Sequence, residues 1–318
     1  MNNPLVSVII PCYNAEKYVE EAVRSIMTQT YKNIEILVTE DCSTDNTLKI
    51  LKNLEKEDSR IKVIQNKKNL KIVKSLNNMI NIAQGKYIAR MDADDISLPE
   101  RIEKQVRFME ENPEYGVCGT NAWHIDERGY TIGKSNLPIT YEDNKFYLVY
   151  YSTLYHPTIM LRSDIYKKNF YSDVFLYAED YELWCRLVFK ENIKVINLVE
   201  RLFKYRIFQT QSSSVYHNKQ IAASSKIFDT YNIIEKNNVS IHKNVFFMHD
   251  KNHVIENEFL YIKNQYNELC KKKFVYSYEC IHKLFYHLFS CYSKAKLIPF
   301  LLRPKGFISI IKILRKQF

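Results

Sequence analysis

The sequence lacks several patterns that would place it in a well-known class. Its seven scattered cysteines include no Cys-x-x-Cys pair, which argues against a zinc ribbon, a redox pair or a disulfide framework. No run of 18 apolar residues occurs, so no membrane-spanning helix is predicted. The first residues form neither a basic region nor a long apolar segment. We therefore expect no signal peptide and a reducing, cytoplasmic location.

Acidic residues are missing from the whole stretch 280–318. Residues 1–218 hold 29 Lys and Arg and 29 Asp and Glu, whereas residues 219–318 hold 17 and 7, so the net charge of +10 lies in the C-terminal part. Residues 307–316 have the pattern of a basic amphipathic helix. We expect this tail to contact an anionic membrane, at the inner face of the cell membrane. A helix that packs on the protein with its basic face in water fits the same pattern.

The rest of the chain has the composition of a folded protein, with 46% hydrophobic residues among 318. Over the first 115 residues, continuous apolar runs alternate with segments of helical spacing. The expected strands are 5–10, 34–39, 61–65 and 87–91, and the expected helices are 16–28, 45–57, 72–83 and 98–111. This order predicts an α/β fold with a mostly parallel sheet and flanking helices.

An acidic stretch follows the fourth expected strand and is the strongest single signal. Asp92, Asp94 and Asp95 lie so close together that a cation between them would relieve their repulsion. Carboxylate oxygens on a half-open loop suit Mg²⁺ or Mn²⁺ that also binds a substrate diphosphate. Ser97 and Glu100 form a capping-box pattern, which predicts that a helix starts directly. An acidic turn that only caps this helix would explain the same residues.

Polar residues also follow the first two expected strands, at 11–14 and 40–43. The carboxyl ends of parallel strands meet at one edge of the sheet, where ligands bind. We therefore expect these two segments and the acidic stretch to converge on one site.

After residue 115 the pattern changes. Residues 117–122 and 130–133 predict a hairpin, residues 155–161 a strand, residues 180–187 an amphipathic helix, and residues 195–198 and 202–207 two further strands. The regular α/β pattern ends near residues 211–214, and a mostly helical tail is expected beyond it.

Four segments in this order resemble glycosyltransferase family 2 with the GT-A fold. They are residues 6–14, 36–45, 89–95 and 178–184, and the resemblance covers about residues 4–217. The likeness is greatest to bacterial transferases that extend lipooligosaccharide, O-antigen or capsule chains through β-linkages. It implies a catalytic domain at 1–217, with a nucleotide-sugar half at about 1–115 and an acceptor half at about 116–217. Residues 218–318 would be the helical extension.

The resemblance also implies roles for single residues on the donor side. Pro11, Tyr13 and Asp41 would line the uracil pocket of a UDP-sugar. Asp94 would lie near the ribose and the metal, and Asp95 would ligate Mn²⁺ or Mg²⁺.

Three further positions carry open alternatives. Asp92 would bind the nucleotide-sugar indirectly or hold Arg90 or a lysine. Lys74 or Lys71 would replace the family's arginine near the diphosphate, although either is equally well explained as a solvated charge.

On the acceptor side, Asp180 would be the general base, with Glu179 as the fallback, because one carboxylate must take the proton of the acceptor hydroxyl. His156 is expected either to contact the acceptor or to be a hydrogen-bonded structural histidine. Trp184 is expected in the core more readily than as a platform for a sugar.

The chain departs from the family pattern at Glu40, Cys42 and Phe208, where many relatives carry Asp, Gly and a metal-reaching His. The sequence thus predicts an inverting, metal-dependent transferase that moves a hexose or N-acetylhexosamine from a UDP-sugar to a lipid-linked glycan. Direct displacement by a single base turns an α-linked donor into a β-glycoside. A catalytically silent scaffold that binds nucleotide-sugar or membrane is the alternative. No nucleic-acid-binding module accompanies the basic tail, so a nucleic-acid partner is not expected.

Overall fold

The computed structural model of the chain describes residues 3–148, 151–208 and 217–231. Its strands are β1 (Val6–Cys12), β2 (Ile34–Glu40), β3 (Ile61–Gln65), β4 (Tyr87–Arg90), β5 (Ile96–Ser97), β6 (Tyr115–Ile125), β7 (Thr131–Lys134), β8 (Met160–Arg162) and β9 (Lys194–Arg206). Its α-helices are α1 (Val19–Met27), α2 (Thr47–Glu57), α3 (Lys71–Ile82), α4 (Arg101–Glu111), α5 (Tyr141–Leu148), α6 (Ser163–Lys168), α7 (Glu179–Cys185) and α9 (His217–Tyr231).

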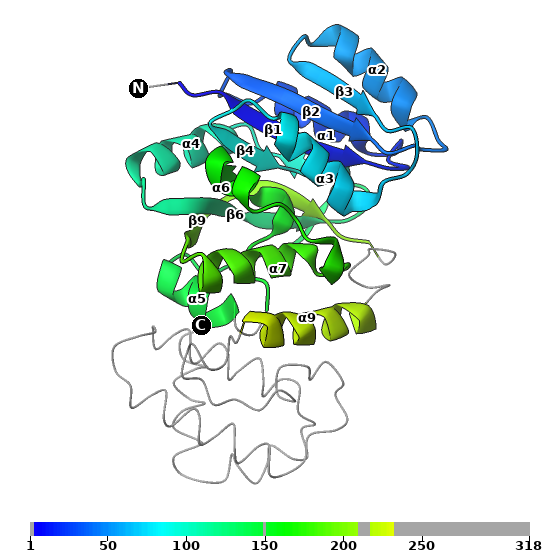
Figure 1. Cartoon of the computed structure of the whole chain (residues 1–318). Coiled ribbons are helices and arrows are strands. Elements are labelled where there is room, and N and C mark those ends of the chain that lie inside the picture. The colour runs from blue at the N-terminus through cyan, green and yellow to red at the C-terminus, as the bar shows by residue number, and fades with distance from the viewer. Residues whose placement is uncertain (1–2, 149–150, 209–216, 232–318) are drawn as a thin grey trace, which may run out of the picture. The chain divides into compact units, whose positions relative to one another are not determined.

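In the described part of the chain, the strands form one nine-stranded sheet in the order β3-β2-β1-β4-β8-β6-β9-β5, with β7 beside β6 (Figure 1). The four strands from the first 90 residues are parallel to one another, as predicted, and β4 pairs with β8 in the antiparallel direction on its other side. The chain moves outward from β1 to β3 and then returns to the other side of β1 for β4. The carboxyl end of β1 is therefore a point where the strand order reverses, which is where ligands bind in such sheets.

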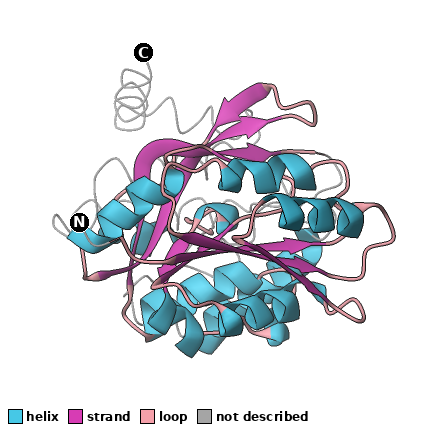
Figure 2. Ribbon diagram, turned by 90° about the horizontal axis from the view of Figure 1, so that it is seen from above, coloured by secondary structure: helices cyan, strands magenta, loops and turns pink. Residues whose placement is uncertain are grey.

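Helices cover both faces of this sheet (Figure 2). Helix α1 packs beside α2, whereas α3 packs beside α6. Right-handed crossovers explain this division, because reversing the direction of travel along the sheet carries the helix to the opposite face. The amphipathic spacing of α1 places Val19, Val23 and Ile26 completely inside the core. The sheet thus has the two covered faces that its apolar strands predicted.

The second half of the sheet is mixed, so the fold is less parallel than the sequence predicted. Strand β6 is antiparallel to β7 and β8 but parallel to β9. The predicted hairpin is present, with Gly129 at a φ of 87° in its turn. The two strands expected at 195–198 and 202–207 are a single strand, β9. The strand expected over 155–161 is wrong in its first part, because Pro157 lies in a 3₁₀ turn at His156–Thr158 and extended pairing begins only at Met160.

The capping box expected at Ser97 and Glu100 is not formed. Residues Ile96 and Ser97 stay extended and pair with β9, so helix α4 begins only at Arg101. The Ser97 hydroxyl instead accepts a hydrogen bond from Gln29 of the α1–β2 connection at 3.2 Å. The acidic loop is therefore held between two strands, β4 and β5, rather than between a strand and a helix.

The chain divides into two units, Met1–Tyr231 and Asn232–Phe318. The second unit, which includes the predicted amphipathic segment 307–316, lies outside the described residues. Helix α9 belongs to the first unit, because Ile227 is fully buried and the Tyr231 hydroxyl bonds to Glu182. None of the described helices is both long enough and apolar enough to cross a bilayer.

Candidate active site

The loops that follow β1 and β2 are tied together by their own side chains. The Asn14 carboxamide accepts a hydrogen bond from the Thr44 backbone at 2.9 Å, and the Asn14 backbone donates to the Ser43 hydroxyl at 3.0 Å. The Asp41 backbone donates to the carbonyl of Cys12 at 2.9 Å, directly beyond the paired strands. The two segments therefore form one rigid rim at the carboxyl edge of the sheet.

The turn after β2 keeps the left-handed geometry that glycine favours, although Cys42 stands there. Cys42 has a φ of 63° and is exposed. Glu40, the neighbouring departure from the family pattern, is 1% exposed and accepts a hydrogen bond from the Ser43 backbone at 2.5 Å. Both substitutions are thus compatible with a closed turn.

Asp41 lies at the inner end of this turn, and protein donors surround its carboxylate. One oxygen accepts hydrogen bonds from the Asn66 side chain and the Leu70 backbone, both at 2.7 Å, and the other accepts from the Lys71 backbone at 2.9 Å. Asp41 is 5% exposed. The residue therefore fixes the start of α3 against the end of β2 at the predicted nucleotide side of the site. Pro11 lies beside it, half-buried in β1 opposite Thr39 of β2.

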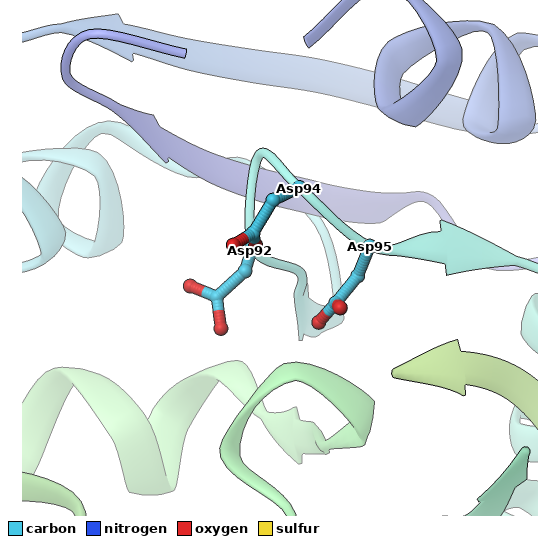
Figure 3. Close-up of side chains that lie close together, drawn as sticks. All are labelled: Asp92, Asp94 and Asp95. Atoms are coloured by element: carbon cyan, nitrogen blue, oxygen red, sulfur yellow. The ribbon is translucent and has the colours of Figure 1, made fainter. Parts of the chain in front are cut away.

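The three acidic residues lie on the loop between β4 and β5. Each can contribute one carboxylate oxygen to a set of three in which all atoms lie within 4.8 Å of one another. Figure 3 shows that the three side chains leave the loop toward the same region. Carboxylates gathered this closely can bind one divalent cation with oxygen ligands.

Burial raises the pKa values of two carboxylates in this cluster. Asp95 is 1% exposed, and burial followed by the charges of Asp94 and Asp92 raises its pKa well above the usual range. Burial and the charge of Asp92 raise the pKa of Asp94 to about 6. One oxygen of Asp95 accepts a hydrogen bond from the Arg206 backbone at 2.7 Å, but the other is buried without any partner. A buried carboxylate oxygen with no donor is costly, and a cation bound here would supply its missing partner. The residues present therefore fit a divalent metal.

Arg206 at the end of β9 braces the acidic loop. Its side chain is 2% exposed and donates to the Asp94 carbonyl at 2.7 Å, to the carbonyls of Asp126 and Glu127 in the β6–β7 turn, and to Glu21 of α1 at 2.8 Å. It also lies over the ring of Tyr18 at 4.3 Å. One guanidinium therefore ties the acidic loop to α1, to β9 and to the β6–β7 turn.

Arg90 connects the acidic loop with the region of α7. Its side chain is 4% exposed and pairs with Asp92, with one hydrogen bond of 2.6 Å. Asp92 therefore holds Arg90, which is one of the alternatives that its sequence position left open. The Arg90 charge opposes the shift that burial imposes on the pKa of Glu179 and of Asp180.

Two carboxylates lie in the first turn of α7. Burial raises the pKa of Asp180, and the charge of Asp92 adds to that shift. Burial and the charge of Asp180 raise the pKa of Glu179 to about 7, and one Glu179 oxygen is buried without a partner. The backbone N–H groups at the start of α7 favour ionised Asp180. A carboxylate with these properties can accept a proton from a substrate hydroxyl.

Comparison with known proteins agrees with this arrangement. The family model "Glycosyl transferase family 2" matches residues 7–170. An uncharacterised glycosyltransferase of Haemophilus influenzae is 39% identical over 236 residues, which cover 71% of this chain and 72% of that protein. The chain belongs to glycosyltransferase family 2.

Two further similarities extend the comparison beyond the family assignment. The UDP-Glc:alpha-D-GlcNAc-diphosphoundecaprenol beta-1,3-glucosyltransferase WfgD of Escherichia coli is 34% identical over 67% of this chain and 81% of its own length. The crystal structure of S. aureus TarS 1-349 in complex with UDP-GlcNAc has a TM-score of 0.62 at 20% identity, over 83% of this chain and 80% of that one. This second likeness confirms the GT-A fold. Helix α7 lies beyond the family-model match, so the role of Asp180 in this family 2 glycosyltransferase depends on its position in the site.

The burial of Trp184 excludes one of its two predicted roles, that of a platform for a sugar. Its side chain is completely buried in α7, so it is a core residue and cannot present a face to a sugar. His156 packs against it edge-on at 6.1 Å and bonds to the Tyr171 hydroxyl. Burial and the Arg90 charge hold the pKa of His156 well below its usual range, so it is neutral. His156 therefore has the hydrogen-bonded structural role that was one of its two interpretations.

The remaining donor-side positions lie at the same edge of the transferase but are more open. Tyr13 is 50% exposed on the loop after β1, where its ring is free to meet a flat ligand. Lys74 is exposed on α3, and the Lys71 backbone binds Asp41. Phe208 stacks on Tyr18 at 6.5 Å, so an aromatic pair occupies the place of the metal-reaching histidine of relatives.

Sequence reasoning found the acidic cluster of this transferase but assigned no role to Arg206, which lies in the strand expected over residues 202–207. The available signal was a charged residue at the end of an apolar strand, Leu202–Ile207, whose side chain needs buried partners.

Proposed function

We propose that this protein is an inverting, metal-dependent glycosyltransferase that moves a hexose or N-acetylhexosamine from a UDP-sugar to a lipid-linked glycan, forming a β-linkage in the synthesis of a bacterial surface polysaccharide. The observation that carries the proposal is the buried Asp95 oxygen without a partner, next to Asp94 and Asp92. The charge of Asp92 also adds to the rise that burial causes in the pKa of Asp180 in α7. Together these groups would hold the leaving diphosphate and supply the base that takes the proton of the acceptor hydroxyl.

On the donor side, Asp94 and Asp95 would hold Mn²⁺ or Mg²⁺. When bound, the ion stabilises the negative charge that develops on the diphosphate as the sugar leaves. Tyr13 would lie against the uracil, and Asp41 and Pro11 would shape the pocket at the end of β2. Arg206 keeps the acidic loop in place, so the carboxylates need no rearrangement when the donor binds.

On the acceptor side, Asp180 would take the proton of the attacking hydroxyl. A single base that activates a direct displacement inverts the configuration at the anomeric carbon, so an α-linked UDP-sugar yields a β-glycoside. The first turn of α7 supports this role because its N–H groups stabilise the ionised carboxylate. Glu179 is the fallback base, since its pKa of about 7 lets it exchange a proton near neutral pH.

The choice of substrates follows the comparisons. The relative WfgD is named for a UDP-glucose donor and a diphosphoundecaprenol-linked acceptor, and the TarS complex contains UDP-GlcNAc. We extend both features to this chain: a UDP-linked donor and an acceptor glycan on a lipid diphosphate. Residues 1–115 would bind the donor and residues 116–217 the acceptor.

The basic tail would hold the enzyme at the membrane where such an acceptor is found. The excess of positive charge in residues 219–318 supports this part of the proposal. The full chain should sediment with vesicles that contain phosphatidylserine and stay in solution with neutral phosphatidylcholine vesicles at low salt. Equal sedimentation with both would show that the charge of the tail does not direct binding.

Product analysis tests the catalytic proposal. The protein is incubated with Mn²⁺ and each of UDP-glucose, UDP-galactose, UDP-GlcNAc and UDP-GalNAc, together with α-GlcNAc-diphospho-lipid as acceptor. We expect one donor to give a product whose new linkage is β by NMR. EDTA should abolish turnover, and Asp180→Asn should lower it by roughly 10²–10⁴-fold. Asp173→Asn, an exposed aspartate near the same helix, is the matched control and should be fully active.

The proposal fails if no donor binds to the folded wild-type protein, or if Asp180→Asn and Glu179→Gln both turn over like the wild type. An α-linked product would retain the transferase assignment but exclude the single-displacement mechanism.

A further inference from the structure

Three half-buried aromatic side chains come together next to the acidic loop. Tyr155 and Tyr205 lie with ring centroids 5.3 Å apart, and His124 lies 6.0 Å from Tyr155 and 6.3 Å from Tyr205. They come from distant parts of the chain: His124 from β6, Tyr155 from the segment before the 3₁₀ turn, and Tyr205 from β9. Both tyrosines border the hydrophobic core of the sheet, yet all three side chains keep part of their surface exposed.

This aromatic cluster faces the acidic loop. Tyr205 immediately precedes Arg206, whose backbone binds Asp95, and the adjacent Lys204 pairs with Ile96 of β5. Tyr205 is thus one residue from the backbone contact to Asp95, and the charges of Asp95, Asp92 and Asp94 add to the rise that burial causes in its pKa. The tyrosine lies near the carboxylates that would hold the donor diphosphate.

The other end of the cluster leads toward α7. His156, directly after Tyr155, packs on Trp184 of α7. The cluster thus lies one residue along the chain from a contact with each of two elements, the acidic loop and α7. In a sugar transfer, the pyranose of the donor and the first pyranose of the acceptor must lie between the groups that hold the diphosphate and the base.

Two polar groups of the cluster are joined by a hydrogen bond. His124 Nε2 and the Tyr155 hydroxyl are 3.1 Å apart and hydrogen-bonded, and burial lowers the pKa of His124, so the imidazole is neutral. The Tyr205 hydroxyl donates no hydrogen bond to another described residue. An aromatic ring offers an apolar face to the C–H groups of a sugar, and its hydroxyl is a donor and acceptor for sugar hydroxyls.

We propose that His124, Tyr155 and Tyr205 form a pyranose-binding subsite of the transferase. The inference depends on the proposed function, because the subsite is placed relative to the carboxylates that would hold the donor diphosphate. Tyr205 and Tyr155 supply ring faces, and His124 fixes the orientation of the Tyr155 hydroxyl. Such a subsite recognises a neutral sugar ring and has no contact with the uridine.

Binding measurements with and without a sugar test this subsite directly. UDP, UDP-glucose and UDP-GlcNAc are titrated in the presence of Mn²⁺ into the wild type, Tyr205→Leu and Tyr155→Leu. Binding of free glucose and GlcNAc to the UDP complex is followed by saturation-transfer NMR. Tyr115→Leu is the matched control, because Tyr115 is also a half-buried tyrosine of the sheet that borders the same core but lies at the other end of β6.

We expect all variants to bind UDP within about twofold of the wild type, since UDP carries no sugar. If the subsite holds the donor sugar, Tyr205→Leu and Tyr155→Leu lose roughly tenfold in affinity for the UDP-sugars. If it holds the acceptor sugar, they bind UDP-sugars normally but lose the NMR signal of the free pyranose. Tyr205→Phe, which keeps the ring, should retain most of the wild-type behaviour in either case.

The subsite is overturned if both leucine variants, folded and binding UDP, keep UDP-sugar and free-pyranose binding within about twofold of the wild type. A loss of UDP affinity equal to the loss of UDP-sugar affinity would also overturn it, since that result indicates a general disturbance of the site. Failure of the wild type to bind UDP at all is a different result, which removes the proposed function itself.

Discussion

Two buried aspartates at the same edge of the sheet differ in how the protein treats them. Asp41, after β2, is 5% exposed and accepts hydrogen bonds from three N–H donors. Asp95, in the loop between β4 and β5, is 1% exposed, accepts one hydrogen bond, and has an oxygen without a partner. The fold thus satisfies the carboxylate on the proposed nucleotide side of the site and leaves the carboxylate on the proposed metal side without a full set of partners. An incomplete buried carboxylate costs stability, and a ligand that completes it recovers that cost on binding.

The largest effect that tests this comparison should come from Asp95→Asn. We expect turnover to fall roughly a thousandfold, because the amide is a weak ligand for a hard cation. The free energy of unfolding without metal should be unchanged or higher, because the variant removes an uncompensated buried charge and keeps the acceptor for Arg206. Activity assays and guanidinium unfolding in EDTA measure the two quantities. If Asp95→Asn is inactive because it is markedly less stable than the wild type, the contrast drawn between Asp95 and Asp41 is wrong.

Asp41→Asn should show the opposite behaviour. The new amide places a donor against N–H groups that now bind a carboxylate, so we expect the free energy of unfolding to fall by about 2–3 kcal/mol. Affinity for UDP should fall as well, because the start of α3 loses its anchor on β2. Asp173→Asn, at an exposed position, is the control and should change neither quantity. If Asp41→Asn unfolds like the wild type, the three short hydrogen bonds do not stabilise the fold.

The sequence singled out the positions of the two aspartates but not their hydrogen-bond partners. Apolar runs and helical spacing predicted the parallel half of the sheet, and parallel strands must bring their carboxyl ends to one edge. The acidic loop and the loops after β1 and β2 were therefore singled out without a structure, and the start of α7 was singled out by the family resemblance. The identity of the donors to Asp41 was not, because Asn66 and Leu70 lie about 25 to 29 residues away in a loop with no pattern of its own.

The errors of the sequence reasoning have a common physical origin. Ser97 has the local pattern of a helix cap, but pairing of Ser97 with Phe203 of β9 is worth more than a cap hydrogen bond, and the helix starts later. For Trp184 the sequence favoured the core over a sugar platform, and its complete burial in α7 decides between the two. Long-range packing decided both cases, and local residue patterns carry no information about it.

A pH-dependent contrast is expected at Glu179, another described carboxylate with a buried oxygen that lacks a partner. Its pKa is raised from about 4.5 to about 7, so the folded protein binds this proton more tightly than the unfolded chain. Stability from this group is present at low pH and is lost as the pH rises toward 7. Glu179→Gln, which stays neutral, should therefore gain about 1–3 kcal/mol over the wild type between pH 5 and pH 8.

Chemical unfolding of wild type and Glu179→Gln at both pH values, in EDTA, measures this difference. Glu142→Gln, at an exposed glutamate of α5, is the control and should show no pH-dependent difference from the wild type. An equal offset at pH 5 and pH 8 would mean that Glu179 does not titrate differently in the folded protein.

The smallest expected effect concerns the turn that holds Asp41. Cys42 adopts a φ of 63°, which costs an L-residue roughly 1 kcal/mol relative to glycine in the same conformation. Cys42→Gly should therefore raise the free energy of unfolding by about 0.5 kcal/mol, the remainder being lost to the greater freedom of glycine in the unfolded chain. Cys42→Ala removes the thiol but keeps the strain, so it should match the wild type. If Cys42→Gly instead lowers stability or UDP affinity, the thiol side chain contributes to the nucleotide side of the site, and the departure from the family glycine is functional rather than merely tolerated.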